Sequence, residues 1–233
     1  MATIAQHNRS IDRVIDGITA ELITGYAGLV TQLDTVLDNN TSTDITGIAV
    51  PLAVGVLALI DQLMPRVEGL LTEYADTVEL SVDAPSFNTL VSATRSSIRA
   101  AVESDTKEIV TAAIIGVVIG NSLTQIRSNL RSVRDRASRA IGTIITESIM
   151  TAHGAFGYVI MRLAGITRFT YAGGTISTTR PFCQTHNNKT YTTQEIKTIW
   201  RGSWGGKRPG DPFVVRGGYN CRHYWVPVKG GSE

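Results

Sequence analysis

The last third of the chain gathers the residue types that most restrict how a chain can fold. Both cysteines and all three tryptophans lie between Arg180 and Trp225, where glycine and proline are also frequent. Such a composition is typical of a small, irregular, turn-rich module. The residues before it carry the apolar periodicity of long helices. We therefore expect a mainly α protein, an elongated helical bundle, with a small C-terminal α+β module.

The sequence predicts three consecutive regions. Residues 1–121 are expected to form a helical N-terminal region, residues 122–165 a long connecting helix, and residues 166–233 the turn-rich module. Between Ser10 and Asp38, apolar residues recur at steps of three and four, as on one face of a helix that Ser10 would cap. That stripe needs a partner helix, from the same chain or from a second copy. The second case predicts a homo-oligomer.

Two uncharged apolar runs raise the question of a membrane. They are Ile45–Ile60, which contains Pro51, and Ile109–Ile119. Because a membrane span needs about 20 apolar residues, we interpret both runs as buried core helices and keep bilayer contact as the alternative. Further helices are predicted at Leu63–Leu80 and Phe87–Glu103, with a polar break before Ile109.

Acidic and basic residues are unevenly distributed along the chain. The first 108 residues hold 15 acidic and 6 basic residues, a net charge of −9, and the remainder holds 5 acidic and 16 basic residues, a net charge of +11. The predicted connecting helix carries five arginines, Arg127, Arg131, Arg134, Arg136 and Arg139. They suggest a surface for nucleic acid or an acidic partner. The alternative is a solvated face, or one that pairs with the acidic half of the same chain.

Short elements are predicted after Ile166. Arg168–Ala172 and Thr175–Thr179 flank a pair of glycines, a pattern that favours a β-hairpin. Thr192 and Glu195 have the spacing of a capping box that opens a short helix. Phe213–Arg216 and His223–Val226 are strand candidates.

Two pairs of metal-binding residue types lie in the module. Cys183 is followed by His186, and Cys221 by His223, and two thiolates with two imidazoles can close a tetrahedral zinc shell. A module this small has little core and commonly needs a metal or a disulfide. Residues 1–7 lack the pattern of a secretory signal, so we expect folding in the cytoplasm. A disulfide and buried unpaired thiols remain alternatives.

The order of several segments resembles a known family. The segments are Arg139 with Thr146-Glu147 on a helix, Tyr171-Ala-Gly, Thr179-Arg-Pro-Phe-Cys183, Gly217-Gly-Tyr-Asn-Cys-Arg-His223 and Trp225-Val-Pro. Over residues 126–228 the chain resembles the C-terminal domain of tailed-phage minor head, or head-morphogenesis, proteins of the Mu F-like type. It departs from them at Cys-Arg-His, where many relatives have Cys-Arg-Cys.

The resemblance implies a structural and assembly protein of a virion, without enzymatic activity. It implies assembly in the host cytoplasm, association with the portal or inner capsid, and the portal and major capsid protein as partners. The basic half would be placed to contact packaged DNA without sequence specificity. The alternative is an internal ejection protein whose apolar helices contact the host envelope during genome delivery.

Overall fold

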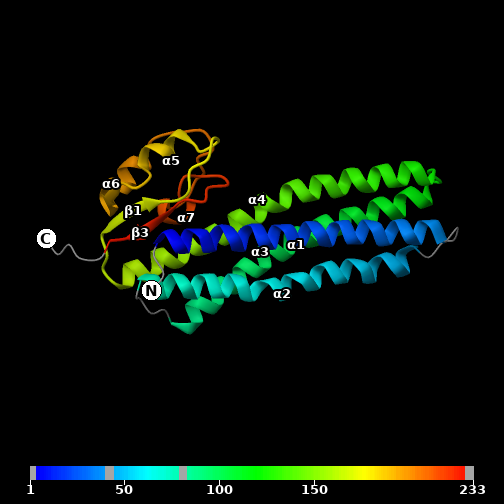
Figure 1. The fold of residues 1–233 in the computed structure, drawn as a ribbon, viewed down its shortest axis with the longest axis horizontal. Coiled ribbons are helices and arrows are strands. Elements are labelled where there is room, and N and C mark those ends of the chain that lie inside the picture. Colours follow the sequence, from blue (N-terminus) through cyan, green and yellow to red (C-terminus); the bar gives the residue numbers. More distant parts are fainter. Residues whose placement is uncertain (1–3, 40–44, 79–82, 229–233) are drawn as a thin grey trace. The chain divides into compact units, whose positions relative to one another are not determined.

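The structure is a computed structural model that describes residues 4–39, 45–78 and 83–228. Four long helices pack together, and a small antiparallel sheet lies in the C-terminal part (Figure 1). This confirms the predicted fold class, a mainly α protein with a small C-terminal α+β module. The long helices are α1 (Ile4–Asn39), α2 (Ile45–Val78), α3 (Ala84–Val118) and α4 (Leu123–Leu163).

Three of these helices run through predicted boundaries. Ser10 lies inside α1 and does not cap it. α2 continues through Pro51 and Pro65, where two separate helices were predicted. α3 likewise continues through the polar residues 104–107, because Thr106 is buried there between the buried Val102 and Ile109. Tertiary packing of one continuous face outweighs the local breaking signals.

The apolar stripe of α1 is buried within the chain. Its members at Ile11, Ile15, Ile18, Leu22, Tyr26, Leu29 and Leu33 are at most 3% exposed. Helices of the same chain thus supply the partner that this stripe requires, so it does not by itself call for a second copy.

The two apolar runs bury only part of their surface. In α2, Val50 and Val54 are 51% and 58% exposed, and at the end of α3 Val118 is 76% exposed. Other members of the runs, such as Ile60 and Ile109, are fully buried. Among the described residues, Gly47–Thr77 is long and apolar enough to cross a membrane, a test that core helices of soluble proteins also pass. The prediction of core helices therefore holds for one face of each run.

The long connecting helix is a single element. Ser122 Oγ accepts a hydrogen bond from the Gln125 backbone N–H, and Gln125 Oε1 accepts one from the Ser122 N–H at 2.9 Å. This reciprocal capping satisfies two amides that the first turn of α4 would leave without partners.

The chain divides into two compact units that cut across the order of the sequence. One unit comprises residues 1–14, 66–94 and 146–233, and the other comprises residues 15–65 and 95–145. Each long helix contributes a segment to both units, and the division within α2 falls directly after Pro65. The C-terminal module therefore shares its unit with the end segments of the helices.

The sheet joins segments that are distant in sequence. Its strands are β1 (Arg168–Ala172), β2 (Thr190–Thr192) and β3 (Tyr224–Pro227), in the order β2-β1-β3. Both pairings are antiparallel, and Tyr171 lies opposite Trp225. The predicted hairpin is wrong, because residues 175–179 form no strand. That segment is polar, and its one large apolar residue, Ile176, is 71% exposed, so it offers no apolar face to bury.

Three short helices complete the module: α5 (Pro181–His186), α6 (Thr193–Ile199) and α7 (Pro212–Val215). The predicted capping box of α6 is confirmed, with Thr192 and Glu195 bonded in both directions. The predicted strand at 213–216 is wrong. Pro212 stands at the start of α7 and Asp211 caps it, accepting a hydrogen bond from the Phe213 N–H at 2.9 Å. Both residues favour the first turn of a helix.

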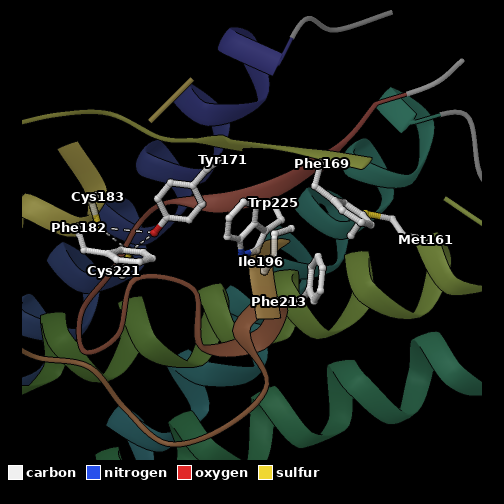
Figure 2. Close-up of a cluster of buried hydrophobic side chains, with 9 residues drawn as sticks. All are labelled: Met161, Phe169, Tyr171, Phe182, Cys183, Ile196, Phe213, Cys221 and Trp225. Carbon is white, nitrogen blue, oxygen red and sulfur yellow. Dashed lines mark hydrogen bonds between the residues drawn. The ribbon is translucent and has the colours of Figure 1, made fainter. Parts of the chain in front are cut away.

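Aromatic side chains fill the core of the module (Figure 2). Buried residues of this core are Met161, Phe169, Tyr171, Phe182, Cys183, Ile196, Phe213, Cys221 and Trp225. Trp225 donates its indole N–H to the Pro212 carbonyl at 3.0 Å, which satisfies a polar group that burial would otherwise penalise. Both cysteines belong to this core, so they lie away from bulk water.

Candidate metal centre

The two cysteines lie close together, and a different local structure positions each of them. Cys183 lies on α5, which Pro181 opens with a backbone angle suited to a helical first turn. Cys221 follows a tight loop in which Arg216, Gly218 and Asn220 have φ values of 58°, 107° and 52°. Residues other than glycine rarely adopt this left-handed region, so the surrounding contacts must hold the loop in this conformation.

Three donor atoms of metal-binding type converge at the buried end of this loop. The sulfurs of Cys183 and Cys221 lie 3.7 Å apart, and Cys221 Sγ lies 3.9 Å from His223 Nδ1. All three residues are buried, and one donor atom from each lies within 4.8 Å of the others. A set of two thiols and one imidazole can bind a metal, and zinc prefers these donors.

The cysteines are free thiols in this structure. A disulfide would place its sulfurs about 2.05 Å apart, well short of the observed separation. The hydrogen bond with Cys221, together with burial, raises the pKa of Cys183. The same bond, with contributions from His223 and Tyr171, lowers the pKa of Cys221. Of the two thiols, Cys221 is therefore the one whose surroundings favour the thiolate, the form that binds metals.

Tyr171 is a fourth polar group at this place, and it was not among the predicted metal ligands. Its phenol oxygen lies 3.5 Å from each of the two sulfurs. Its position on β1 fixes it there, opposite Trp225 in β3. No spacing pattern in the sequence marks Tyr171, because only the pairing of β1 with β3 brings it to the cysteines.

His186 does not join the other predicted ligands. Its Nδ1 lies 2.7 Å from Tyr191 Oη, and its ring packs on Phe182 with centroids 4.6 Å apart. Residues three and four apart on a helix are both neighbours, so the spacing from Cys183 did not exclude His186, but its contacts with Phe182 and Tyr191 hold the ring elsewhere. The predicted zinc set of two cysteines and two histidines is thus corrected to Cys183, Cys221 and His223.

A cavity of about 570 Å³ adjoins the three donors. Arg180 and Arg222 also line it, as does Asp12 of α1, which forms an ion pair with Arg222 at 3.1 Å. The Arg180 guanidinium donates to the Tyr219 carbonyl. These three lining side chains therefore already have partners.

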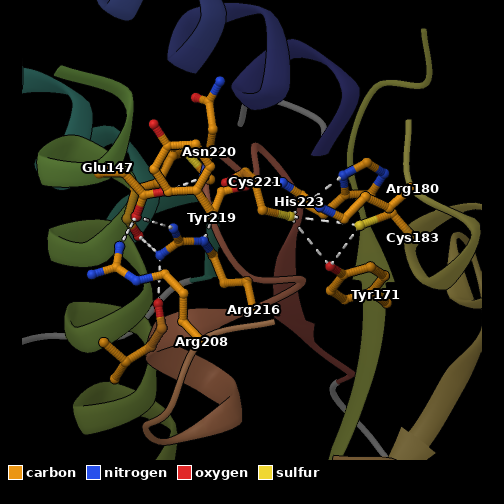
Figure 3. Close-up of polar contacts among 12 residues, drawn as sticks. Glu147, Tyr171, Arg180, Cys183, Arg208, Arg216, Tyr219, Asn220, Cys221 and His223 are labelled. Carbon is orange, nitrogen blue, oxygen red and sulfur yellow. Dashed lines mark hydrogen bonds and ion pairs between the residues drawn. The ribbon is translucent and has the colours of Figure 1, made fainter. Parts of the chain in front are cut away.

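Glu147 connects the loop before Cys221 to helix α4 (Figure 3). Its carboxylate accepts hydrogen bonds from the Asn220 backbone N–H and, at 2.7 Å, from Arg208. The guanidinium of the fully buried Arg216 lies 3.9 Å away and donates to the carbonyls of Met150 and Cys221. A buried arginine requires such partners. In the sequence, Glu147 stands out only as part of the Thr146-Glu147 segment of the predicted helix.

The five arginines of α4 divide into two groups. Arg127 pairs with Asp34 and Asp38 of α1, Arg136 with Glu108 of α3, and Arg134 with its neighbour Asp135. Arg131 and Arg139 are exposed, and the described part of the chain gives neither an ion pair. The pairing of basic α4 with acidic helices of the same chain thus accounts for part of the predicted basic surface.

A second buried polar cluster lies at the start of α1. His7 Nε2 and His153 Nε2 are 2.9 Å apart, and His7 Nδ1 lies 3.4 Å from Glu73. Tyr74 and Tyr224 pack against both rings. His153 has a partner that its sequence position does not reveal, since the two histidines are 146 residues apart.

Comparisons with protein-family models, with curated proteins and with solved structures found no match for this chain.

Proposed function

We propose that this protein is a structural and assembly protein of a tailed-phage virion, a minor head protein associated with the portal or inner capsid. The resemblance over residues 126–228 is the basis of the proposal. One observation supports it best: the two segments most distinctive of the resemblance, Thr179–Cys183 and Gly217–His223, meet at one buried cluster. The meeting of two segments 38 residues apart supports the view that they form one structural element of the module.

The cluster has a structural role in this proposal, with zinc as the bound metal. Cys183, Cys221 and His223 would hold the ion, which would join α5 to the segment before β3. The core around them is small, so a metal would add stability that apolar burial alone does not supply. We therefore propose a protein without enzymatic activity, whose partners are the portal, the major capsid protein and further copies of this chain.

Contact with packaged DNA forms a smaller part of the proposal. Arg131 and Arg139 are the members of the arginine group that remain exposed without an ion pair in the described residues. Contacts of this kind are electrostatic and weaken with salt. Any DNA binding by α4 is expected to be weak and without sequence preference.

The test is the composition of assembled particles. Purified virions of a phage that encodes this chain would be cross-linked, and the neighbours of the chain identified by mass spectrometry. We expect the protein in heads at low copy number, cross-linked to the portal or major capsid protein through exposed lysines such as Lys189 and Lys197. Its absence from assembled heads would contradict the proposal.

The second candidate function is ejection with the genome and contact with the host envelope. It is favoured by the exposed apolar residues of α2, among them Ile48, Val50 and Val54, and by the length of its apolar segment. Flotation of the purified chain with anionic vesicles tests it. Firm binding that is lost in a Val50→Ser, Val54→Ser variant would favour ejection, and no binding in the wild type would exclude this route.

A further inference from the structure

Four polar atoms meet in the buried centre of the module, and they come from three separate segments (Figure 3). Cys183 Sγ lies on α5, Tyr171 Oη on β1, and Cys221 Sγ and His223 Nδ1 lie just before β3. The oxygen is 3.5 Å from both sulfurs, which are 3.7 Å apart. The distances between pairs of these donor atoms can be compared with the distances between the ligand atoms of a tetrahedral metal site.

Four of the six distances among these donor atoms can be compared with those of tetrahedral zinc. Bond lengths of about 2.3 Å to sulfur and about 2.0–2.2 Å to oxygen or nitrogen give separations of about 3.8 Å between two sulfurs and about 3.5–3.7 Å between sulfur and oxygen or nitrogen. The sulfur–sulfur and both sulfur–oxygen distances match these values, and the sulfur–nitrogen distance of 3.9 Å exceeds them by a few tenths. We propose that Tyr171 is the fourth ligand of a zinc site formed with Cys183, Cys221 and His223. This inference rests on the zinc binding proposed above and names the residue that completes the shell.

The rings of Tyr171 and His223 approach the sulfurs together. They stack with centroids 5.3 Å apart and planes 15° apart, because their strand segments are neighbours in the sheet. Tyr171 is fully buried, and the two sulfurs are the hydrogen-bond partners that the structure gives its oxygen. His223 is also buried, and its Nε2 has no partner among the described residues. Buried polar groups that contact chiefly one another are costly unless a ligand compensates them.

The surrounding charges suit a site that carries negative charge. Two thiolates, one phenolate and a neutral imidazole around Zn²⁺ have a net charge of −1. Arg216 is fully buried beside them, and its Nε donates to the Cys221 carbonyl at 3.3 Å. Arg180 and Arg222 line the adjoining cavity. Positive groups on these sides would stabilise the site.

A glycine leaves the space that the four atoms need. A Cβ on Gly217 would lie 2.5 Å from Cys183 Sγ, 2.7 Å from Tyr171 Oη and 2.8 Å from Cys221 Sγ. The bare Cα of Gly217 therefore closes one side of the site against the sulfurs and the phenol. A side chain or an additional ligand has no room on that side.

The test uses the full chain, freed of metal and titrated with Zn²⁺ while ultraviolet difference absorption is recorded. Phenol coordination releases the Tyr171 proton to solvent, so we expect a tyrosinate band that grows to one equivalent per zinc. This measurement needs no variant and does not depend on a variant that folds. Tight zinc binding without a tyrosinate band would overturn the role of Tyr171 and leave the zinc site itself standing.

Variants then assign the band to its residue. Tyr171→Phe is expected to abolish the band and to weaken Zn²⁺ binding by at least the roughly 10–100-fold that loss of an outer partner of a ligand costs. Co²⁺ bound to this variant should show changed d–d bands, since the ligand set changes. Tyr191→Phe is the matched control, because it removes a phenol oxygen that contacts His186 and not the sulfurs.

The outcomes distinguish the role of Tyr171 as a ligand from the existence of the zinc site. Unchanged zinc affinity and cobalt spectrum in Tyr171→Phe would show that this tyrosine only packs in the core. Absence of zinc binding by the wild-type chain, with circular dichroism showing a folded protein, would overturn the zinc site as well. Neither result would bear on the presence of the protein in virions.

Discussion

Gly217 shows how the absence of one side chain allows its neighbours to pack close together. Two sulfurs and a phenol oxygen occupy the space into which any side chain at this position would point. The backbone there lies between Arg216 and Gly218, both with positive φ. Because the neighbours are buried and belong to one core, they have little freedom to move away.

Substitution Gly217→Ala is therefore expected to destabilise the chain. Overpacking a close-packed core costs about 1–3 kcal/mol, and here the added methyl group would also separate the thiols. Denaturant unfolding of the metal-free protein measures the change. Gly205→Ala is the control, since a Cβ at Gly205 meets nothing within 4 Å. Equal stability of the two variants would contradict the packing shown at Gly217.

The buried pair His7 and His153 is a second feature at the residue scale, and it links stability to pH. Burial lowers the pKa of His7, although Glu73 opposes this shift, and burial together with the neighbouring His7 and Arg216 lowers the pKa of His153. In the unfolded chain, both imidazoles take up protons at about pH 6.5. Below that pH the unfolded state binds more protons, so acid favours unfolding.

The free energy of unfolding is thus expected to fall as the pH drops through about 6.5, and to keep falling until the lower folded-state pKa values are reached. Each histidine contributes at most about 1.4 kcal/mol per pH unit. Denaturant unfolding at several pH values in the wild type and in a His7→Gln, His153→Gln variant isolates the pair. A pH dependence as steep in the variant as in the wild type would show that these histidines do not cause it.

At the scale of elements, short helices in the module depend on local capping, whereas the long helices depend on packing. The first turn of α6 is satisfied by Thr192 and Glu195, whose hydrogen bonds lower the pKa of the Glu195 carboxyl. Long α2 and α3 cross prolines and polar residues that would end an isolated helix. The buried faces of these two helices compensate for those local costs.

Removal of the α6 cap tests this contrast. Thr192→Ala is expected to cost about 0.5–2 kcal/mol, because an amide of the first turn loses its acceptor. Thr198→Ala, at an exposed position late in the same helix, should change the stability by about 0.5 kcal/mol or less. Thermal or denaturant unfolding of both variants provides the comparison. A larger loss for Thr198→Ala would show that the cap does not stabilise α6.

At the scale of the whole molecule, Glu147 is one of the residues that tie the module to α4, together with the hydrogen bond from Arg216 to the Met150 carbonyl. Glu147 bonds the loop at Asn220 and faces the buried Arg216, so it connects the segment that carries Cys221 with the helix. Its side chain is 16% exposed, whereas that of Arg216 is 1% exposed. The buried guanidinium therefore depends on Glu147 and on backbone carbonyls for its partners.

Substitution Glu147→Ala is expected to destabilise the protein by on the order of 2 kcal/mol, since it removes charge-assisted hydrogen bonds from a largely buried site. Arg208→Ala, which removes only the half-exposed partner, should cost less than about 1 kcal/mol. Limited proteolysis between α4 and β1, around residues 164–167, gives a second measurement, and faster cleavage is expected only for Glu147→Ala. Equal rates in both variants would contradict a tie through Glu147.

The sequence by itself determined the helical character of the long segments, the cap of α6, and the residue types at the candidate metal centre. These are local properties: periodicity, capping spacing and the chemistry of Cys183, Cys221 and His223 are all present along the chain. Only the tertiary structure decided which residues meet. It paired β1 with β2 and β3, placed His186 beside Tyr191, and brought Tyr171 to the sulfurs and His153 to His7. These contacts depend on burying apolar faces from distant segments together, and no short window of sequence contains both partners.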